Sequence, residues 1–375
     1  MKKIILIISI IIALFLTTGC WDMVEINQRI FPYSVAVDLN EGEGEKYLVT
    51  ISYLNINAIG KNAIQDQRVF VVSTKANSVF QAAKQLSTRI PYPFYFKHLR
   101  VLLIGEELAK DGHQVRQMMD GMSRDFIINK KIQIVMAEDK AGRILETVPK
   151  STKQEKIEGT LFSMLRDGKK ASRFSSKTLT DFVQTTDSDG IAIVPIMTVN
   201  KDEIVVFGGA IFKDYCFIGK IDEIENRSIS LMRDMVKSEL IDIPYKGATI
   251  SYAISGQSLK RKLIQEDKKL VMKLDIEIEG ALQEYIIRDH VAGEDLKIIK
   301  EMEEALNGEV KKEIDKTLEV IQKKYKADAI GVGEYISNFH PKLWKQIEKD
   351  WEEIFSQMEI DVNIDTKIRR RGLVK

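Results

Sequence analysis

The sequence predicts an α+β fold in several domains, with mixed and antiparallel sheets packed by helices. Apolar residues alternate along the chain between a period of two, which is typical of strands, and a period of three to four, which is typical of helices. The chain has 375 residues, of which 44% are hydrophobic and 30% are charged. This length and composition are sufficient for two or three folded domains.

A signal peptide is predicted over residues 1–19. Lys2 and Lys3 precede an almost purely apolar run, Ile4 to Leu16. As a helix, this run covers about 20 Å, whereas the hydrocarbon core of a bilayer is about 30 Å thick, so it is short for a permanent span. Because the two lysines stay on the cytoplasmic side, the α+β ectodomain that follows is expected outside the cytoplasm.

Cys20 is predicted to be the lipidated N-terminus of the mature chain. Thr17, Thr18 and Gly19 are small residues that a signal peptidase admits, and the cysteine follows at once, which is the order of a lipobox. Leucine is more common at the place that Thr17 occupies. A diacylglyceryl group on Cys20 supplies two acyl chains, enough for stable anchoring. The alternatives are a plain secretory peptide that is cleaved nearby and an uncleaved anchor.

Charge and cysteine content argue against nucleic-acid binding and against a disulfide-stabilised fold. Once Lys2 and Lys3 are removed with the signal peptide, 54 basic residues face 55 acidic ones, which gives no electrostatic signature of nucleic-acid binding. Lipidation of Cys20 leaves Cys216 without an internal partner, so the fold is expected to lack a disulfide. Cys216 is predicted to be a small buried hydrophobic residue.

An N-terminal α+β domain is predicted over residues 20–198. Its elements are inferred from hydrophobic periodicity, turn residues and helix-capping residues. In order, they are a hairpin of strands 29–40 and 46–54, a strand at 68–74, a helix at 77–90 capped by Asn77 or Ser78, a strand at 97–105 buried on both faces, two short helical pieces within 106–125, and a strand at 129–139.

Residues 150–189 are more polar, and we expect a boundary near them. A C-terminal region, 199–375, follows, with a division into a middle domain, 199–255, and a C-terminal domain, 256–375, as the alternative. Its predicted elements are strands at 204–221, with a bend or bulge at Gly208 and Gly209, a half-exposed strand at 271–280, a long helix at 296–325 that Gly308 kinks, a shorter helix at 340–355, and a strand at 358–371.

No catalytic or metal-binding motif occurs in the sequence. It has no HExxH, GxSxG, P-loop or CxxC pattern, so neither an enzymatic activity nor a cofactor is predicted. The four histidines, His98, His113, His290 and His340, are dispersed, and structural or surface roles are expected for them. The "TDSDGI" segment lacks the glutamate that closes a calcium loop and is interpreted as a turn.

Three features of the last third allow a structural or a functional interpretation. Gly331 and Gly333 are interpreted as a turn that lets the backbone pack closely, because a third glycine of a dinucleotide motif is missing. Trp344 and Trp351 lie on one apolar stripe, so core packing is favoured over a partner interface. The arginines at 369–371 form either a solvated strand end or a contact with anionic lipid.

Five segments together resemble the Ger(x)C family of spore germination lipoproteins, the C subunits of nutrient germinant receptors in endospore-forming bacteria. They are "GCWDMVEIN", "KHLRVLLIGEELAKDG", "GGAIFKD", "KADAIGVGEYISNFHPKLWKQIEKDWEEIF" and "IRRRG". The similarity runs from Cys20 to about Gly372, and the fourth segment is the most specific. Cys20, as the lipidation site, is the one functional residue that the resemblance carries over.

The resemblance implies a non-enzymatic receptor subunit without a cofactor, anchored on the outer face of the spore inner membrane. Its implied partners are an A subunit, with a soluble portion and membrane helices, and a transporter-like integral membrane B subunit. The subunit would be needed for the response to small-molecule germinants, and whether it contacts germinant stays open. The alternatives are a lipid-anchored extracytoplasmic solute-binding protein of a transporter, which should have two similar lobes, and an envelope hydrolase with an unfamiliar site.

Overall fold

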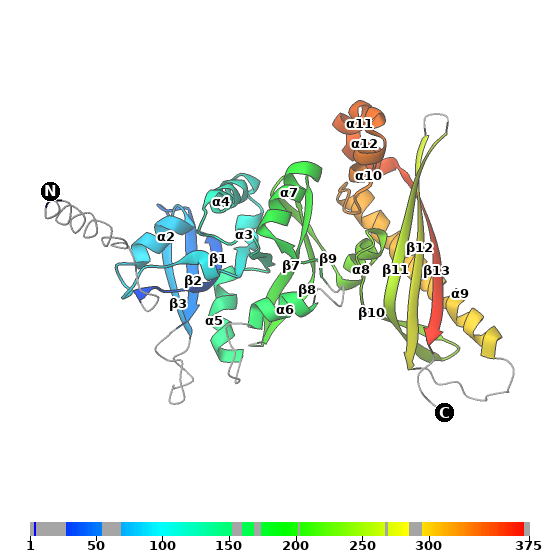
Figure 1. The fold of residues 1–375 in the computed structure, drawn as a ribbon, viewed down its shortest axis with the longest axis horizontal. Coiled ribbons are helices and arrows are strands. Elements are labelled where there is room, and N and C mark those ends of the chain that lie inside the picture. The colour runs from blue at the N-terminus through cyan, green and yellow to red at the C-terminus, as the bar shows by residue number, and fades with distance from the viewer. Residues whose placement is uncertain are drawn as a thin grey trace.

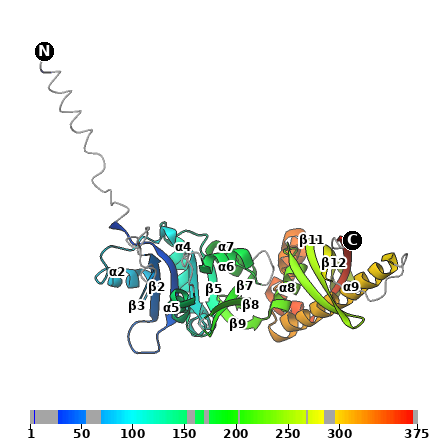
Figure 2. The same ribbon diagram turned by 90° about the horizontal axis from the view of Figure 1, so that it is seen from below.

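The computed structural model describes Ile4 and residues 28–54, 69–151, 160–168, 174–201, 203–266, 269–284 and 295–370. Cys20 and His290 lie outside the described residues. The described chain forms an elongated molecule built on two sheets, one of nine strands and one of four (Figures 1 and 2). This arrangement of two sheets packed by helices confirms the predicted α+β fold class.

The first sheet has the order β3-β2-β1-β4-β5-β7-β8-β9, with β6 paired to β5. β1 and β2 form the predicted antiparallel hairpin, whereas β1, β4, β5 and β7 run parallel. The strands are β1 (Pro32–Leu39), β2 (Tyr47–Leu54), β3 (Val69–Ala76), β4 (Val101–Gly105), β5 (Gln133–Ala137), β6 (Lys177–Thr178), β7 (Ile191–Asn200), β8 (Glu203–Lys213) and β9 (Cys216–Ile221).

Helices cover both faces of the first sheet. The helices are α2 (Val79–Leu86), η4 (Phe96–His98), α3 (Glu106–Ala109), α4 (Gly112–Arg124), α5 (Ala141–Ser151), α6 (Thr160–Gly168) and α7 (Leu179–Asp189). Residues of α2, α4 and α7 share one hydrophobic core, and residues of α5 and α6 share the other. Figure 1 shows α4 and α7 above the sheet and α5 and α6 below it. All five residues of β4 are therefore buried, as predicted.

Two details of this sheet follow from local chemistry. The side chain of Ser78 accepts a hydrogen bond from the amide of Gln81 and caps α2, but the helix ends at Leu86 rather than at Ile90. Pro91 explains the shortening, because a proline disfavours helical backbone at the residue before it. Gly208 has φ +45° and lies in the predicted bulge, where a Cβ atom would be 2.1 Å from the carbonyl oxygen of Ile221.

Cys216 differs from its prediction. Its side chain is half-buried rather than buried, and its Sγ atom contacts the carbonyl oxygen of Lys110 at 3.2 Å. The cause is its place at the start of the edge strand β9, where the α3–α4 turn covers only one side.

The second sheet, in the order β10-β11-β12-β13, is antiparallel apart from the parallel pair β12 and β13. The elements are α8 (Glu223–Met232), β10 (Glu239–Tyr245), β11 (Ala248–Glu266), β12 (Lys269–Glu284), α9 (Asp295–Glu319), the π-helical segment η7 (Val320–Lys324), α10 (Val332–Phe339), α11 (Pro341–Ile347), η8 (Glu348–Asp350), α12 (Trp351–Gln357) and β13 (Glu359–Arg370). The predicted strand, long helix and final strand are present in that order, but the single shorter helix predicted at 340–355 is divided into α11, η8 and α12, and an unpredicted helix, α10, precedes it.

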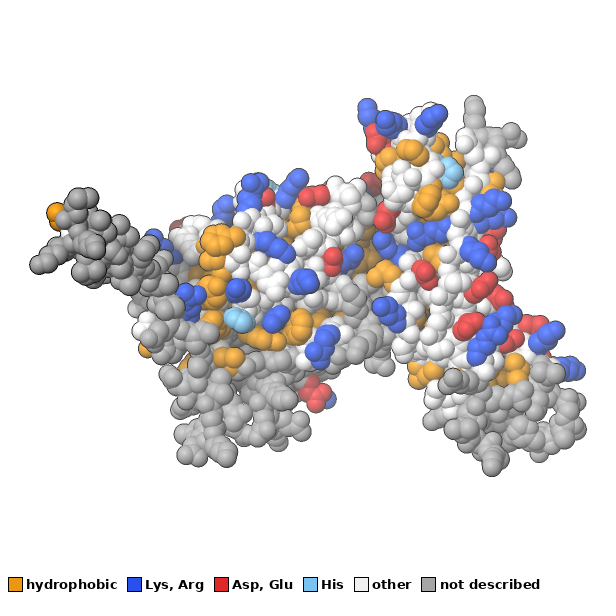
Figure 3. Space-filling view, viewed as in Figure 1, with side chains coloured by type: hydrophobic (Ala, Val, Ile, Leu, Met, Phe, Trp, Pro, Cys, Tyr) orange, Lys and Arg blue, Asp and Glu red, His pale blue; other side chains and the backbone are white. Residues whose placement is uncertain are grey.

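The two faces of this sheet have opposite character. Met272, Leu274, Ile276 and Ile278 of β12 are buried in one core with residues of α9. The other face carries ion pairs such as Lys260 with Glu277, and Figure 3 shows acidic and basic side chains interleaved over it. A charged, ion-paired face is a water-facing surface.

The predicted boundary at residue 198 does not coincide with an end of the first sheet. That sheet continues through β8 and β9 to Ile221, and the interval 199–255 is divided between the two sheets. The division of the chain into domains stays a prediction. Below, the first unit means the described residues up to Ile221, and the second unit means those that follow.

Candidate functional site

The most specific of the quoted segments folds into the helical block that joins the two units. It begins with a turn in which the carboxylate of Asp328 accepts hydrogen bonds from the amides of Val332, at 3.0 Å, and Gly333, at 2.6 Å. Gly331 between them has φ +73°, a left-handed backbone that favours glycine. Burial raises the pKa of Asp328 above its usual value, although the two amides act in the opposite direction.

Two tryptophans pack directly on this turn. A Cβ atom at Gly333 would lie 2.8 Å from Nε1 of Trp351 and 3.0 Å from the ring of Trp344. The two indoles meet edge to face, with ring centroids 5.3 Å apart, and both pack against the core of the second unit. The interpretations of the glycines as a close-packing turn and of the tryptophans as core-packing residues are thus confirmed.

Two arginines tie the turn to the rest of the second unit. Arg233, at the end of α8, donates to the carbonyl oxygen of Ala329 at 3.2 Å and to the carboxylate of Glu334 at 3.3 Å. Arg261, on β11, donates to the carbonyl oxygens of Met232 and Ile330, at 2.9 and 3.3 Å. Burial lowers the pKa of Arg261, and the charge of Arg233 adds to this effect.

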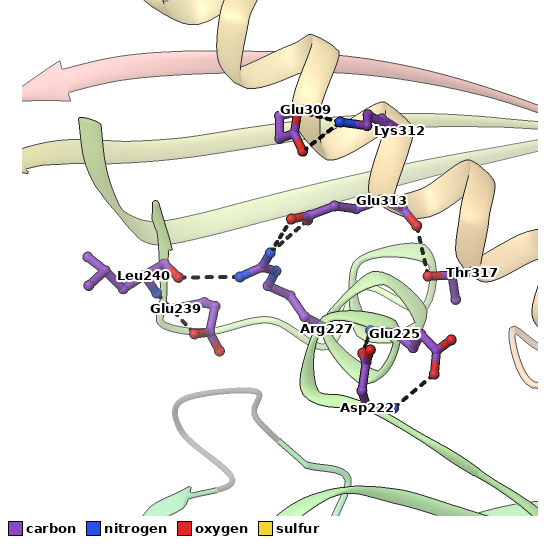
Figure 4. A network of polar contacts seen from close by, with 9 residues as sticks. All are labelled: Asp222, Glu225, Arg227, Glu239, Leu240, Glu309, Lys312, Glu313 and Thr317. Atoms are coloured by element: carbon purple, nitrogen blue, oxygen red, sulfur yellow. Dashed lines mark hydrogen bonds and ion pairs between the residues drawn. The ribbon is translucent and has the colours of Figure 1, made fainter. Parts of the chain in front are cut away.

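A further ion pair fixes α8 against α9 (Figure 4). The guanidinium of Arg227 donates two hydrogen bonds to the carboxylate of Glu313, at 2.8 and 2.7 Å, and the side chains are only 12% and 14% exposed. Asp222 and Glu225 form a capping box at the start of α8, which sets its direction. These contacts hold α8 between β10 and α9. The segment that leaves the first sheet after β9 therefore has a fixed position in the second unit.

The first unit meets this block through the edge strand β9. The hydroxyl of Tyr325 donates to the carbonyl oxygen of Lys220 at 2.8 Å, and a Cβ atom at Gly219 would lie 2.0 Å from the Tyr325 ring. Lys220 extends to the carboxylates of Glu106 and Glu138, at 3.1 and 2.9 Å. Burial lowers the pKa of Lys220, but both carboxylates outweigh it, and the pKa lies above its usual value.

The cavity between the two units is much smaller than a solute-binding cleft. The cavity where the units meet, lined by Ser175, Arg233 and Ala329 among others, has a volume of only about 20 Å³. A larger groove of about 440 Å³ lies inside the second unit, between the β11–β12 end and α11–α12, and apolar residues such as Leu343, Ile347 and Met358 line it. A drug-sized ligand usually occupies at least about 300 Å³.

Cys20, the one site residue predicted from the sequence, lies outside the described residues, and the three described histidines lie in different elements. His98 lies in η4, His113 in α4 and His340 between α10 and α11, on separate surfaces. In the ranges that the structure describes, no group of three His, Cys, Asp or Glu side chains is placed to hold a metal ion. Within the same ranges, no helix has the length and hydrophobicity required to cross a membrane.

Several important residues were not found from the sequence. Arg227, Glu313 and Gly219 act through neighbours distant in sequence, which periodicity cannot reveal, and Asp328 acts through the nearby amides of Val332 and Gly333. One signal was available for Asp328, because an aspartate shortly before a glycine turn and a helix is a common acceptor for the exposed amides at a helix start.

Two family models together match most of the chain. One, described as the spore germination protein N-terminal domain, matches residues 22–199, and the other, described as spore germination B3/GerAC like, C-terminal, matches residues 207–372. The chain belongs to the Ger(x)C family. The segment that folds over the junction lies inside the second match, so the site described above is part of the Ger(x)C C-terminal region.

Individual Ger(x)C relatives align along their full length. Spore germination protein B3 of Bacillus subtilis is 22% identical, over 95% of each chain. Spore germination protein KC of the same organism is 23% identical, over 99% of this chain and 97% of its own. The crystal structure of the GerBC protein matches with a TM-score of 0.62 at 17% identity, covering 90% of this chain and 98% of that one, which shows a shared fold.

Proposed function

We propose that this chain is a non-enzymatic, lipid-anchored subunit of a spore nutrient germinant receptor, needed for the response to small-molecule germinants and for the initiation of germination. The observation that carries the proposal is the match of both Ger(x)C family models, in order, to residues 22–199 and 207–372. Relatives named as spore germination proteins, which align over at least nine-tenths of each chain, support it.

Cys20 is the proposed lipidation site, and the outer face of the spore inner membrane is the proposed location. Two acyl chains on Cys20 hold the ectodomain at the membrane, where its effective concentration for integral membrane A and B subunits is high. The protein therefore acts by assembly, and the chemical steps of germination belong to other proteins.

The geometry favours an assembly subunit over a solute-binding protein. The two units differ in strand order and in strand direction, whereas a binding protein should have two similar lobes. The cavity between them admits little more than a water molecule. The hydrogen bond from Tyr325 to the carbonyl oxygen of Lys220 instead connects the two units, which suits a scaffold that presents surfaces to partners.

Co-purification from spore inner membrane tests the proposal. A C-terminally tagged wild-type chain is compared with Cys20→Ala and with Cys216→Ala, the matched control at the other cysteine, in spores without paralogous receptors. We expect A and B subunits with the wild type and with Cys216→Ala, and a strongly reduced yield with Cys20→Ala. Germination in nutrients should follow the same order.

Two results would contradict the proposal. The first is the absence of A and B subunits from a wild-type preparation that is folded and lipidated. The second is a normal nutrient response from spores that lack the chain altogether. Co-purification of a transporter ATPase would favour a solute-binding protein instead.

A further inference from the structure

One edge of the first sheet collects the segments nearest to the N-terminal end of the described chain. β1, β4 and β5 are parallel neighbours, with Ser34 opposite Val101 and Val101 opposite Gln133. The segments that lead into these strands therefore lie side by side at one edge. We call residues 29–31, 89–98 and 125–131 together the tether edge. They occupy the end of the elongated molecule that carries β1 to β3 (Figure 1).

Aromatic and basic side chains form the first part of the tether edge. The guanidinium of Arg29 lies 4.4 Å from the ring centroid of Tyr95, and the ring of Phe31 meets the rings of Tyr95 and His98 edge to face. Backbone hydrogen bonds join Ile30 to this segment on both sides. Tyr92, Lys97 and His98 are exposed next to the cluster, so it is an ordered surface.

The second part is a loop that holds one phenylalanine in water. Phe126 is 93% exposed, the highest value among the large hydrophobic residues of the described chain. The carboxylate of Asp125 accepts hydrogen bonds from the amides of Ile127 and Ile128, and the ammonium of Lys130 donates to the carbonyl oxygen of Met122 at 2.9 Å. A loop fixed in this way holds the Phe126 side chain outward, in water.

One stretch of the chain at this end of the molecule is basic and free of acidic residues. Between Asp66 and Glu106 the sequence has no acidic residue and has six Lys or Arg residues. Arg89 and Lys97 of this stretch are exposed on the tether edge. Figure 3 shows basic and hydrophobic side chains gathered over the first unit. Amphipathic aromatics with basic residues are the composition found at the interface of anionic membranes.

The segment between Cys20 and Gln28 limits how far the start of the first unit can lie from the membrane. Eight residue steps separate Cys20 from Gln28, the first residue of the continuous described chain, and they span at most about 28 Å when fully extended. If Cys20 is held in the bilayer, Gln28 lies within this distance of the lipid head groups, and residues 29–31 of the tether edge follow it directly. A basic surface near the head groups is attracted to an anionic leaflet.

We propose that the tether edge rests on the bilayer, with Arg89 and Lys97 on anionic lipid head groups and with Tyr92 and Phe126 in the interfacial layer. The inference rests on the lipidation of Cys20 in the proposed function. It adds an orientation of the protein relative to the membrane. The first unit lies against the bilayer through the tether edge, and the second unit projects away from the bilayer.

Lipid-dependent quenching tests this orientation. The full, lipidated chain with Cys216→Ser carries a fluorescent label on either Phe126→Cys or Phe339→Cys, the matched control on α10, which is 69% exposed in the second unit. Each is reconstituted into vesicles of equal parts phosphatidylcholine and phosphatidylglycerol that contain a nitroxide-labelled lipid. We expect strong quenching at position 126 and little at position 339. Arg89→Glu with Lys97→Glu should remove most of the quenching at 126, whereas Lys311→Glu with Lys312→Glu on α9 should not.

The outcomes separate this inference from the proposed function. Mass analysis of Cys20 and flotation with the vesicles are measured first, and an unlipidated chain that does not float refutes the lipid-anchored function itself. With lipidation established, equal quenching at 126 and 339 overturns the proposed orientation. Equal quenching at 126 in pure phosphatidylcholine overturns the anionic contact. Quenching at 126 that requires A and B subunits in the vesicles identifies a protein partner in place of lipid.

Discussion

Gly333 has no space for a side chain because two indoles lie against its backbone. Replacing it with alanine places a methyl carbon only 2.8 Å from Nε1 of Trp351. We expect Gly333→Ala to lower the free energy of unfolding by about 1–3 kcal/mol, since overpacked sites force side chains or backbone to shift. Urea unfolding of the purified protein measures this change.

Gly308 provides the matched control. It lies on the exposed side of α9, where a Cβ atom would meet nothing within 4 Å. Gly308→Ala should leave stability unchanged or raise it by up to about 1 kcal/mol, because alanine favours a helix. An equal change in stability for Gly333→Ala and Gly308→Ala would show that the two tryptophans move aside without cost and that Gly333 is not a close-packing position.

Helix α8 depends on a nearly buried ion pair with α9. Removing one partner, as in Arg227→Met, leaves the Glu313 carboxylate uncompensated, and we expect a loss of about 3–5 kcal/mol in the free energy of unfolding. The double variant Arg227→Met with Glu313→Leu should lose less than Arg227→Met alone, because no charge then stays buried. A double-mutant cycle in urea gives both values.

An exposed pair on the same helix is the comparison for this effect. Lys311 and Asp315 are 38% and 51% exposed, and breaking such a pair costs roughly 0.2–1 kcal/mol. If Arg227→Met costs no more than Lys311→Met, α8 does not depend on the buried pair.

At the same scale, some predicted elements hold and others differ for identifiable reasons. The hairpin of β1 and β2 and the buried strand β4 follow from alternation and from an apolar run, which are local patterns. Helix α9 continues through Gly308, so the kink there stays a prediction, and the helix ends in the π-helical segment η7. η7 brings Tyr325 onto β9, a requirement of tertiary packing that the local sequence does not carry.

The packing of β9 against α3 in the first unit should depend on pH. Burial raises the pKa of Glu106, but the hydrogen bond and charge of Lys220 outweigh it, so the pKa lies below its usual 4.5. The stability that Glu106 contributes is therefore complete above pH 4.5 and is lost as the pH falls through the lower folded-state pKa. We expect the stability difference between wild type and Lys220→Met to shrink in that acidic range, as measured by unfolding from pH 7 to pH 3. A difference that is constant with pH would contradict the coupling.

Gly219 and Tyr325 set the relative position of the units. Gly219→Ala places its Cβ atom 2.0 Å from the Tyr325 ring, so the ring must leave β9. We expect Gly219→Ala to broaden the distribution of distances between spin labels on Arg124→Cys and Lys345→Cys, measured in a Cys216→Ser background. Gly256→Ala, on β11, has open space and should leave the distribution narrow. A narrow distance distribution for Gly219→Ala would show that the contact between Gly219 and Tyr325 does not set the relative position of the units.

Over the whole molecule, the sequence by itself determined the α+β class, most strands and helices, the turn at Gly331 and Gly333, and the family. These depend on patterns and motifs that are local in the chain, such as alternation, helical spacing and turn residues. Only the tertiary structure decided that the first sheet continues to Ile221, that Arg227 meets Glu313, that Lys220 joins two carboxylates, and that the tether edge is one surface. Each of these joins residues tens of positions apart, and such pairs are selected by the packing of the whole fold and not by any local periodicity.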